Sequence, residues 1–543
     1  MILALPNLVG LFFAVAASLI VWWCQSYRGK CVLSSAQCEE FFKYTSGRWL
    51  YNEKQQLAVR YVQFNVEALQ GIAATVIGAK YCTKILKMHE GSYNKIFLLK
   101  FDNNQEIIAK IPTKLIPPFY TTASEVATMD YARTVLNLPV PEVLAYSARA
   151  NSTPVGSEFI LMRRTPGTEL GKLWDSMKDE DANQVIDQVL CAESQFTQYQ
   201  FSQIGSIYYT QDVEPCLRAR PLYKNGSGSE PGAEKFRIGP STEWALWRGS
   251  RATLRVDRGP WPDVQSYIQG VVRIHQAWLA NCARAYTVSV PPRNLEDLDR
   301  KTHHQLLNTL VRLSSKVRIL PEFCDHVLWH KDLHAKNIMV TSSSPPSIML
   351  IDWQNVSVGP LFHQATFAIF AQYHGDSRIN LFNNAQLPEN FQELPWHERI
   401  YLGHQRRLAL RHLYYSSRTE RASLDAQCWS HKVPLRSAID EASRTWETGP
   451  GLFREHISNL AAASGIRDFE VLHGKNQDRL MAYKDRVRRL YRGLEVEGDG
   501  WVPNERYHDV YAMNMERMQC WDEAAAGGPY PIVDGAPSWF VGS

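Results

Sequence analysis

Residues 327–340 read VLWHKDLHAKNIMV, and the run IMLIDW follows at residues 348–353. The first stretch contains the spacing His-x-Asp-x-x-x-x-Asn, which runs from His330 through Asp332 to Asn337. The second is an apolar run that ends on Asp352. Apolar runs of this length beside polar turns predict short strands, which would hold the loop between them rigid. The pattern therefore predicts three oxygen-bearing side chains presented from the ends of short strands.

These three side chains suit phosphoryl transfer. That reaction needs a carboxylate near the acceptor hydroxyl, and it needs two oxygen ligands that hold Mg²⁺ against the nucleotide phosphates. We predict that Asp332 serves the acceptor and that Asn337 and Asp352 bind the metal. His330 would orient the loop by hydrogen bonding, and His334 is a weaker candidate for contacting Asp352 or phosphate.

Two other interpretations of this loop compete with phosphoryl transfer. A polar turn could match the spacing by chance, because Asp, Asn and His all favour turns. A zinc site is the second, since His330 and His334 stand at i and i+4 as in H-E-x-x-H. Lys331 occupies the place of the catalytic Glu, and the neighbouring residues supply no third ligand, which argues against zinc.

The matching half of a nucleotide site is predicted upstream, in the strand EIIAKI at residues 106–111. Lys110 stands there as in the V-A-I-K pattern, whose lysine pairs with the α and β phosphates. A lysine within an apolar run is costly to bury unpaired. Glu125, in the following helical stretch, can form the ion pair that positions Lys110. The alternatives are a solvated lysine at a strand end and an exposed helical glutamate.

Two weaker sequence features are consistent with a nucleotide site that contains Lys110 and Glu125. The turn at residues 90–94 sits between two predicted strands where a nucleotide loop belongs, with Gly91 and Ser92 at its centre, but it has a single glycine. Backbone at residues 161–163, around Met162, would meet the adenine where the two halves of the chain join. Its alternative is a plain linker strand.

The overall pattern predicts an α+β chain with a two-lobed protein kinase-like fold. Strand-like runs at residues 83–88, 95–101 and 106–111, a helix from Thr121, and runs at 142–146 and 158–162 make a small β-rich lobe within residues 41–165. Residues 166–520 are mainly helical, for example at 181–201, 264–286 and 303–320. The Gly/Pro/Ser-rich stretch at residues 221–240 is expected to be a surface insertion, and residues 521–543 a tail.

Composition narrows the function classes. The chain has 543 residues, of which 45% are hydrophobic and 21% charged, as in globular proteins with more than one core. Its 59 basic and 55 acidic residues are too balanced to indicate nucleic acid as the main partner. Ten cysteines without a C-x-x-C pair predict reduced thiols rather than a disulfide scaffold.

The N-terminal segment at residues 1–27 is expected to be a membrane anchor or a targeting sequence. Residues 1–24 carry no charged side chain, and their apolar run approaches the roughly 20 residues that span a bilayer. Arg28 and Lys30 follow the run, so the positive-inside rule leaves the large domain facing the cytosol or matrix. An uncleaved anchor, a cleaved signal and a wrongly assigned start remain the alternatives.

The motif residues resemble a known family. His330, Asp332 and Asn337, followed by IDW at residues 351–353, resemble the pattern of aminoglycoside phosphotransferase and choline kinase-like enzymes. More narrowly, FFKYTSGRW (41–49), RYVQFN (60–65), RATL (251–254) and DRGPW (257–261) resemble the fungal Altered inheritance of mitochondria protein 9 group. The likeness implies a kinase-like fold, a fungal source and a mitochondrial address, with no well-defined substrate.

The expected activity is transfer of the γ-phosphoryl group from ATP, with Mg²⁺, to a hydroxyl of an unidentified small molecule. The sequence Asp352-Trp353-Gln354 replaces D-F-G and no A-P-E follows, which argues against activation-loop regulation. One alternative is a pseudokinase that binds nucleotide or acts as a scaffold in mitochondria. Another is a kinase for protein or lipid at the membrane. The sequence leaves the acceptor and the oligomeric state open.

Overall fold

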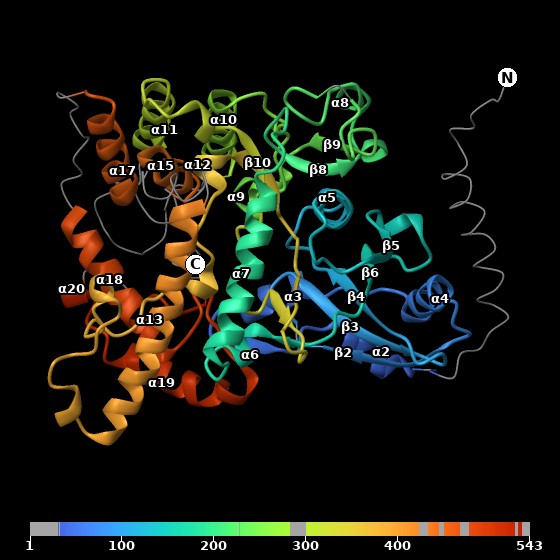
Figure 1. Cartoon of the computed structure of the whole chain (residues 1–543), viewed down its shortest axis with the longest axis horizontal. Coiled ribbons are helices and arrows are strands. Elements are labelled where there is room, and N and C mark those ends of the chain that lie inside the picture. The colour runs from blue at the N-terminus through green and yellow to red at the C-terminus, as the bar shows by residue number, and fades with distance from the viewer. Residues whose placement is uncertain are drawn as a thin grey trace.

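The computed structural model describes residues 31, 33–88, 90–226, 228–282, 300–422, 433–444, 450–466, 477–526 and 530–534. Helices and strands are mixed along these residues. Figure 1 shows an open sheet with its neighbouring helices on the right, in blue and cyan, and a larger, mainly helical assembly that fills the left side and continues in green across the top. The mixed α and β content predicted from the sequence is therefore confirmed.

The larger sheet has five antiparallel strands in the order β2-β3-β4-β6-β5. The helix α5 (Tyr120–Thr134) lies between β4 and β5 in the chain, so the predicted succession of three strands, a helix and two strands is confirmed. The strands are β2 (Cys82–Lys87), β3 (Asn94–Phe101), β4 (Glu106–Pro112), β5 (Val143–Ser147) and β6 (Phe159–Arg163).

Alternation along β4 decides which side chains face the core. Successive residues of a strand point to opposite faces of its sheet. Ile107, Ala109 and Ile111 join a hydrophobic cluster that also contains residues of α4 (Val66–Val76). Lys110 consequently points to the other face, where it reaches α5.

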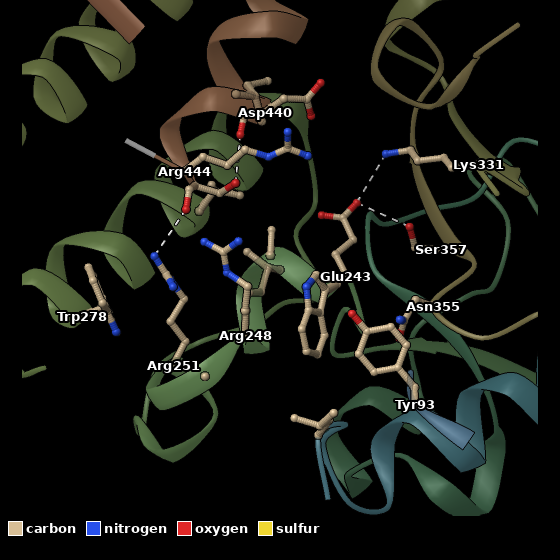
Figure 2. Close-up of a pocket in the computed structure, with 18 of the residues that line it drawn as sticks. Tyr93, Glu243, Arg248, Arg251, Trp278, Lys331, Asn355, Ser357, Asp440 and Arg444 are labelled. Atoms are coloured by element: carbon tan, nitrogen blue, oxygen red, sulfur yellow. Dashed lines mark hydrogen bonds and ion pairs between the residues drawn. The ribbon is translucent and has the colours of Figure 1, made fainter. Parts of the chain in front are cut away.

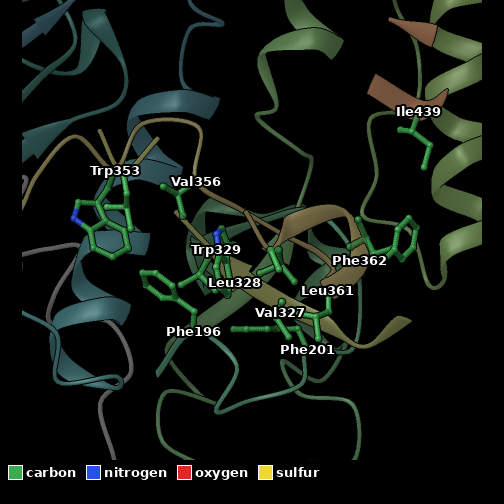
Figure 3. Close-up of a cluster of buried hydrophobic side chains, with 14 of the residues drawn as sticks. Phe196, Phe201, Val327, Leu328, Trp329, Trp353, Val356, Leu361, Phe362 and Ile439 are labelled. Atoms are coloured by element: carbon green, nitrogen blue, oxygen red, sulfur yellow. The ribbon is translucent and has the colours of Figure 1, made fainter. Parts of the chain in front are cut away.

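A second, larger hydrophobic cluster supports the segment that carries the motif (Figure 3). Phe196, the last residue of α7 (Asp179–Phe196), lies 5.6 Å from the Trp329 ring and 6.2 Å from the Trp353 ring, centroid to centroid. Trp329 and Trp353 are both fully buried. Since these tryptophans flank the motif in the chain, the cluster anchors the motif on both sides.

The structure contains the strands that were predicted on both sides of the motif. The strand before the motif and the strand after it pair with different partners. β10 (His326–Trp329) pairs with β13 (Ser357–Pro360). β11 (Ile338–Val340) pairs with β12 (Ile348–Leu350) and also with β7 (Thr168–Glu169). The motif loop thus connects two separate ladders, which fixes both of its ends.

Helices dominate the rest of the described chain. The helix predicted at residues 181–201 ends earlier, at Phe196, and the one predicted at 303–320 begins at Arg300 and ends at Ser314. The long helices are α10 (Val264–Asn281), α11 (Arg300–Ser314), α13 (Trp396–Ala422), α15 (Pro434–Ala442), α17 (Pro450–Ala463), α18 (Gln477–Leu494) and α19 (Tyr507–Gln519).

The stretch at residues 221–240 is not a simple surface insertion, which corrects the expectation from its composition. Leu222, Tyr223 and Phe236 are buried in the large cluster. The strand β9 (Phe236–Gly239) pairs with β8 (Ser206–Tyr209). Glycine and proline predicted a loop, but the apolar residues between them tie the stretch to the core.

The two ends of the described chain pack together. β1 (Gly47–Trp49) pairs with β14 (Trp501–Pro503), and Tyr51 shares a hydrophobic cluster with Tyr483, Val487 and Val502. Ile532, in the segment expected to be a tail, is buried in the same cluster. The N-terminal part of the small lobe expected at residues 41–165 therefore rests on the C-terminal segment.

Membrane association was predicted for residues 1–27, which lie outside the described residues. In the part of the chain that the structure does describe, no helix combines the length and apolarity that crossing a bilayer requires.

Candidate active site

The loop at residues 330–337 has a fixed backbone shape. The His334 amide donates to the Asp332 carbonyl at 2.9 Å, and the Asn337 amide donates to the His334 carbonyl at 2.9 Å. Leu333, which lies between Asp332 and His334 in the chain, is buried and anchors the middle of the loop. These bonds present Asp332 and Asn337 from one tight turn.

Asp332 and Asn337 also bond through their side chains. Asn337 Nδ2 donates to the backbone carbonyl of Asp332 at 2.9 Å and to its carboxylate Oδ2 at 3.2 Å. Asn337 is buried, so its amide has little freedom to turn. Because its nitrogen is directed at Asp332, its carbonyl oxygen is the atom available as a ligand for a cation.

Lys110 joins the two halves of the predicted site. Its Nζ lies 2.7 Å from Glu125 Oε1 and 2.8 Å from Asp352 Oδ1. Lys110 and Glu125 are both buried, in β4 and α5, while Asp352 follows β12. One ammonium group therefore links the sheet, its helix and the motif segment.

The backbone around Asp352 is held in a turn. Asp352 has a φ of 57°, in the left-handed region that aspartate tolerates better than most residues. The Ile351 amide donates to the Asn337 carbonyl at 2.9 Å, and the buried Trp353 ring donates from Nε1 to the Leu350 carbonyl at 2.9 Å. Asp352 is thus fixed from both neighbours, with its side chain directed at Lys110.

Charge around these groups shifts their pKa values. Desolvation alone would raise the pKa of Asp352 and lower that of Lys110, but the attraction between them, together with that of Glu125 for Lys110, outweighs it. The pKa of Asp352 is lowered and that of Lys110 is raised. Desolvation raises the pKa of Asp332, and repulsion from Asp352 adds to the rise. Asp352 therefore stays ionised, while Asp332 holds a proton more readily than an ordinary aspartate.

His330 lies beneath the loop. Its Nε2 is 3.3 Å from the Ile351 carbonyl, and its ring meets the Trp353 ring edge-on at 5.0 Å between centroids. Burial lowers the pKa of His330, so the ring is neutral at physiological pH. His334 Nε2 lies 3.7 Å from Asp332 Oδ2.

The remaining predicted residues lie on the sheet. Gly91 and Ser92 are exposed in the turn before β3, and Met162 lies in β6, where it pairs with Ile108 of β4. This turn also contacts the motif segment: Asn94, at the start of β3, donates from Nδ2 to Gln354 Oε1 at 2.6 Å. The sequence analysis did not predict that contact.

A pocket of about 570 Å³, which the sequence analysis did not predict, lies next to these residues (Figure 2). Lys331, directly before Asp332, lines it, as do Asn355 and Ser357, shortly after Asp352. Figure 2 shows Arg248, Arg251 and Arg444 on one side of the pocket and Lys331 and Ser357 on the other. Two of the stretches quoted for their resemblance, RYVQFN and RATL, supply Arg60 and Arg251 to its lining.

The oxygen donors suit magnesium bound together with a nucleotide. Within the described residues, no three or more His, Cys, Asp or Glu side chains gather into a metal-binding group. Magnesium in phosphoryl-transfer sites needs only one or two protein carboxylates, since phosphates and water complete its shell. The ionised Asp352 and the carbonyl oxygen of Asn337 meet that requirement.

Comparison with known proteins identifies the family. Over 370 residues the chain is 30% identical to a subtelomeric hrmA-associated cluster protein of Aspergillus fumigatus, covering 62% of this chain and 70% of the relative. Over 394 residues it is 27% identical to Altered inheritance of mitochondria protein 9, mitochondrial, of Yarrowia lipolytica, covering 67% and 66%. The chain belongs to the same family as the Aspergillus fumigatus protein. The resemblance inferred from residues 41–65 and 251–261 is therefore confirmed.

Other matches are to kinase-like proteins. The model of the Ecdysteroid kinase-like family matches residues 261–385, which include the motif loop. Among solved structures, an aminoglycoside phosphotransferase is 12% identical with a TM-score of 0.34, covering 75% of this chain and all of that one. An ethanolamine kinase of Plasmodium vivax is 12% identical with a TM-score of 0.35, covering 80% and 94%.

Proposed function

We propose that this chain is an ATP-dependent phosphotransferase with a two-lobed kinase-like fold, acting on a small molecule. The observation that carries the proposal is the position of Lys110 Nζ, 2.7 Å from Glu125 and 2.8 Å from Asp352. A lysine held by a helical glutamate beside an aspartate that can bind metal is the arrangement that kinases use for phosphoryl transfer from ATP. The family match over the motif segment supports it.

Each residue has a role in this proposal. Lys110 would bind the α and β phosphates, the turn with Gly91 and Ser92 would cover them, and backbone near Met162 would meet the adenine. Magnesium, held by Asp352 and Asn337, would supply positive charge against the phosphates when bound.

The transfer itself depends on Asp332. The acceptor hydroxyl oxygen bonds to the γ-phosphorus while the bond from that phosphorus to the β–γ bridging oxygen breaks, giving a phosphomonoester and ADP. Asp332 takes the hydroxyl proton, which its raised pKa favours. Neutral His330, bonded to the backbone beside Asp352, would keep the loop in place.

A second candidate is a nucleotide-binding protein without transfer activity. The exposed turn around Gly91 and Ser92 favours it, because a loop with one glycine covers phosphates less completely than a glycine-rich one. The names of the relatives favour a mitochondrial location for either candidate.

ATP turnover by the full-length protein separates the two candidates. We expect wild type to form ADP slowly with water as the acceptor, and Asp332→Asn to reduce that rate by about 10²–10⁴-fold without weakening ATP binding. Asp485→Asn, at an exposed position in α18, is the control and should match wild type. Equal, measurable rates in Asp332→Asn and wild type would contradict the role of Asp332. ATP binding by wild type without any ADP formation would favour the second candidate.

A further inference from the structure

The pocket in Figure 2 joins the sheet, the motif segment and the helices. Tyr93 reaches it from the turn before β3, and Trp244 from the start of α9 (Trp244–Trp247). Lys331 enters from the motif loop, and Asp440 from α15. Lys331 is the residue before Asp332, so the loop that lines this pocket also carries the carboxylate proposed to serve the acceptor.

Positive side chains outnumber negative ones around the pocket. Among the described residues that line it, five are Arg or Lys and three are Asp or Glu. The cationic residues are Arg60, Arg248, Arg251, Lys331 and Arg444, and the acidic residues are Glu243, Asp440 and Asp499. Like charges that share a partly enclosed space repel one another, so an anion entering the pocket is stabilised.

The three acidic groups already have partners within the protein. Asp440 Oδ1 lies 2.9 Å from His363 Nε2, and Asp499 Oδ2 accepts from Trp49 Nε1 at 3.0 Å. Glu243 Oε2 accepts from the Tyr267 hydroxyl at 3.0 Å. Two of the carboxylates also lie near cations of the pocket: Lys331 Nζ is 3.8 Å from Glu243 Oε1, and Arg60 Nη2 is 3.7 Å from Asp499 Oδ2. These contacts fix the carboxylates and offset part of the charge of Lys331 and Arg60, and the lining keeps an excess of two positive side chains.

Two of the arginines are held in place by aromatic rings. The Arg60 guanidinium lies over the Trp49 ring at 4.4 Å, and that of Arg251 lies over the Trp278 ring at 4.2 Å. Arg251 Nε also donates to His275 Nδ1 at 3.2 Å. Arginines positioned in this way recognise planar anions such as carboxylate and phosphate with little loss of side-chain freedom.

The rest of the wall is aromatic and apolar. The Tyr93 and Trp244 rings meet at 4.9 Å between centroids with an angle of 58° between their planes. Leu246, Val271 and Ile439 line the pocket as well. A pocket of this lining suits a ligand with a ring or another apolar body in addition to its charged group.

We propose that this pocket binds the phosphoryl acceptor, and that the acceptor is a hydroxylated ring compound carrying an anionic group, either a carboxylate or a phosphate. This inference rests on the function proposed above, since it takes Asp332 as the group that receives the hydroxyl proton. The ring would lie against Tyr93 and Trp244, and the anion would meet the guanidinium groups opposite Lys331.

Matched pairs of ligands test the class and separate its two sources. The pair 4-hydroxyphenylacetate and 4-hydroxyphenylacetamide tests a carboxylate, and the pair pyridoxine phosphate and pyridoxine tests a phosphate. Binding to the full-length protein is measured by calorimetry without nucleotide. We expect the charged member of at least one pair to bind about tenfold more tightly than its neutral partner or better. We also expect that member to increase ADP formation from Mg-ATP.

Charge variants locate the effect in the pocket. Arg444→Glu and Arg248→Glu should each remove the preference for the charged ligand. Arg273→Glu, on the exposed face of the same α10 helix that supplies Val271 and Trp278, should keep it. Arg248→Met gives a milder change if Arg248→Glu does not fold.

Three results would overturn the proposal: equal binding of both members of each pair, no binding of any of the four compounds, or a preference that survives Arg444→Glu. If the charged ligands bind but leave ADP formation unchanged, they are not acceptors.

Titration of Mg-ATP into the same protein keeps failure of this proposal distinct from failure of the phosphotransferase function. A protein that binds Mg-ATP but shows no anion preference retains the function and loses the acceptor class. A protein that binds the anions but not Mg-ATP retains an anion pocket and loses the function.

Discussion

Lys110 and Asp352 are 242 residues apart in the chain, yet Lys110 Nζ lies 2.8 Å from Asp352 Oδ1. The same ammonium group bonds to Glu125 at 2.7 Å, within a buried ion pair. This contact joins the sheet to the motif segment. It is both a structural link and the core of the proposed nucleotide site, so it can be tested through stability and through binding.

The first prediction concerns stability. Lys110→Met leaves the buried Glu125 carboxylate without its cation, and we expect the free energy of unfolding to fall by about 3–5 kcal/mol. Adding Glu125→Leu should recover much of the loss, because an apolar pair replaces an uncompensated charge. Chemical denaturation measures both changes.

Lys100→Met is the matched control for that experiment. Lys100 pairs with Glu106 on the same sheet, but its side chain is 41% exposed. We expect a loss of about 1 kcal/mol or less. If Lys110→Met cost no more than Lys100→Met, the buried pair would not support the fold in the way described.

The second prediction concerns pH. Burial, followed by the charge of Arg251, lowers the pKa of His275 well below its ordinary value of 6.5. As the pH falls below about 6.5, the unfolded chain binds a proton there and the folded chain does not, so stability decreases. The slope is up to about 1.4 kcal/mol per pH unit for each such histidine. Buried His330, whose pKa is also lowered by desolvation, adds to it.

His275→Gln should therefore flatten the fall in stability between pH 6.5 and pH 5, as followed by urea denaturation at several pH values. His374→Gln, at an exposed position, is the control. An unchanged slope in His275→Gln would mean that His275 takes up its proton in the folded protein as readily as in the unfolded chain.

The third prediction concerns the two ends of the chain. Trp49, the last residue of β1, is buried and pairs with Trp501 of β14, and its Nε1 donates to Asp499. We expect Trp49→Ala to lower the free energy of unfolding by about 3–5 kcal/mol through cavity formation. Trp396→Ala, where the side chain is 69% exposed, should change it by about 0.5 kcal/mol or less. Similar losses for the two variants would argue against the packing of β1 on the C-terminal segment.

The predictions that the structure confirms rest on local sequence patterns. The strands β2, β3 and β4 were predicted because turn residues separate short runs rich in β-formers, and the motif was found because its polar residues lie within one short stretch. The proposed roles of Asp332, Asn337 and Asp352 stay predictions, although the structure does bring Asp332 and Asn337 into contact.

What the sequence missed depends on long-range packing. The pairing of Trp49 with Trp501 joins opposite ends of the chain, and no local signal indicates it. The pocket takes its walls from segments as distant as Tyr93 and Arg444. The prediction for residues 221–240 was wrong for another reason. Their composition favours a surface loop, but Leu222 and Phe236 are buried because they pack against the hydrophobic core.

The most direct test of the proposed nucleotide site is calorimetric titration of Mg-ATP into the full-length protein, beside Asp352→Ala and Lys110→Ala. We predict magnesium-dependent binding by wild type with a Kd of about 1–100 μM, equivalent to about 5–8 kcal/mol. Asp352→Ala should abolish the magnesium dependence, and Lys110→Ala should weaken binding at least about tenfold. Absence of Mg-ATP binding by folded wild-type protein, or equal binding by Asp352→Ala, would contradict the account.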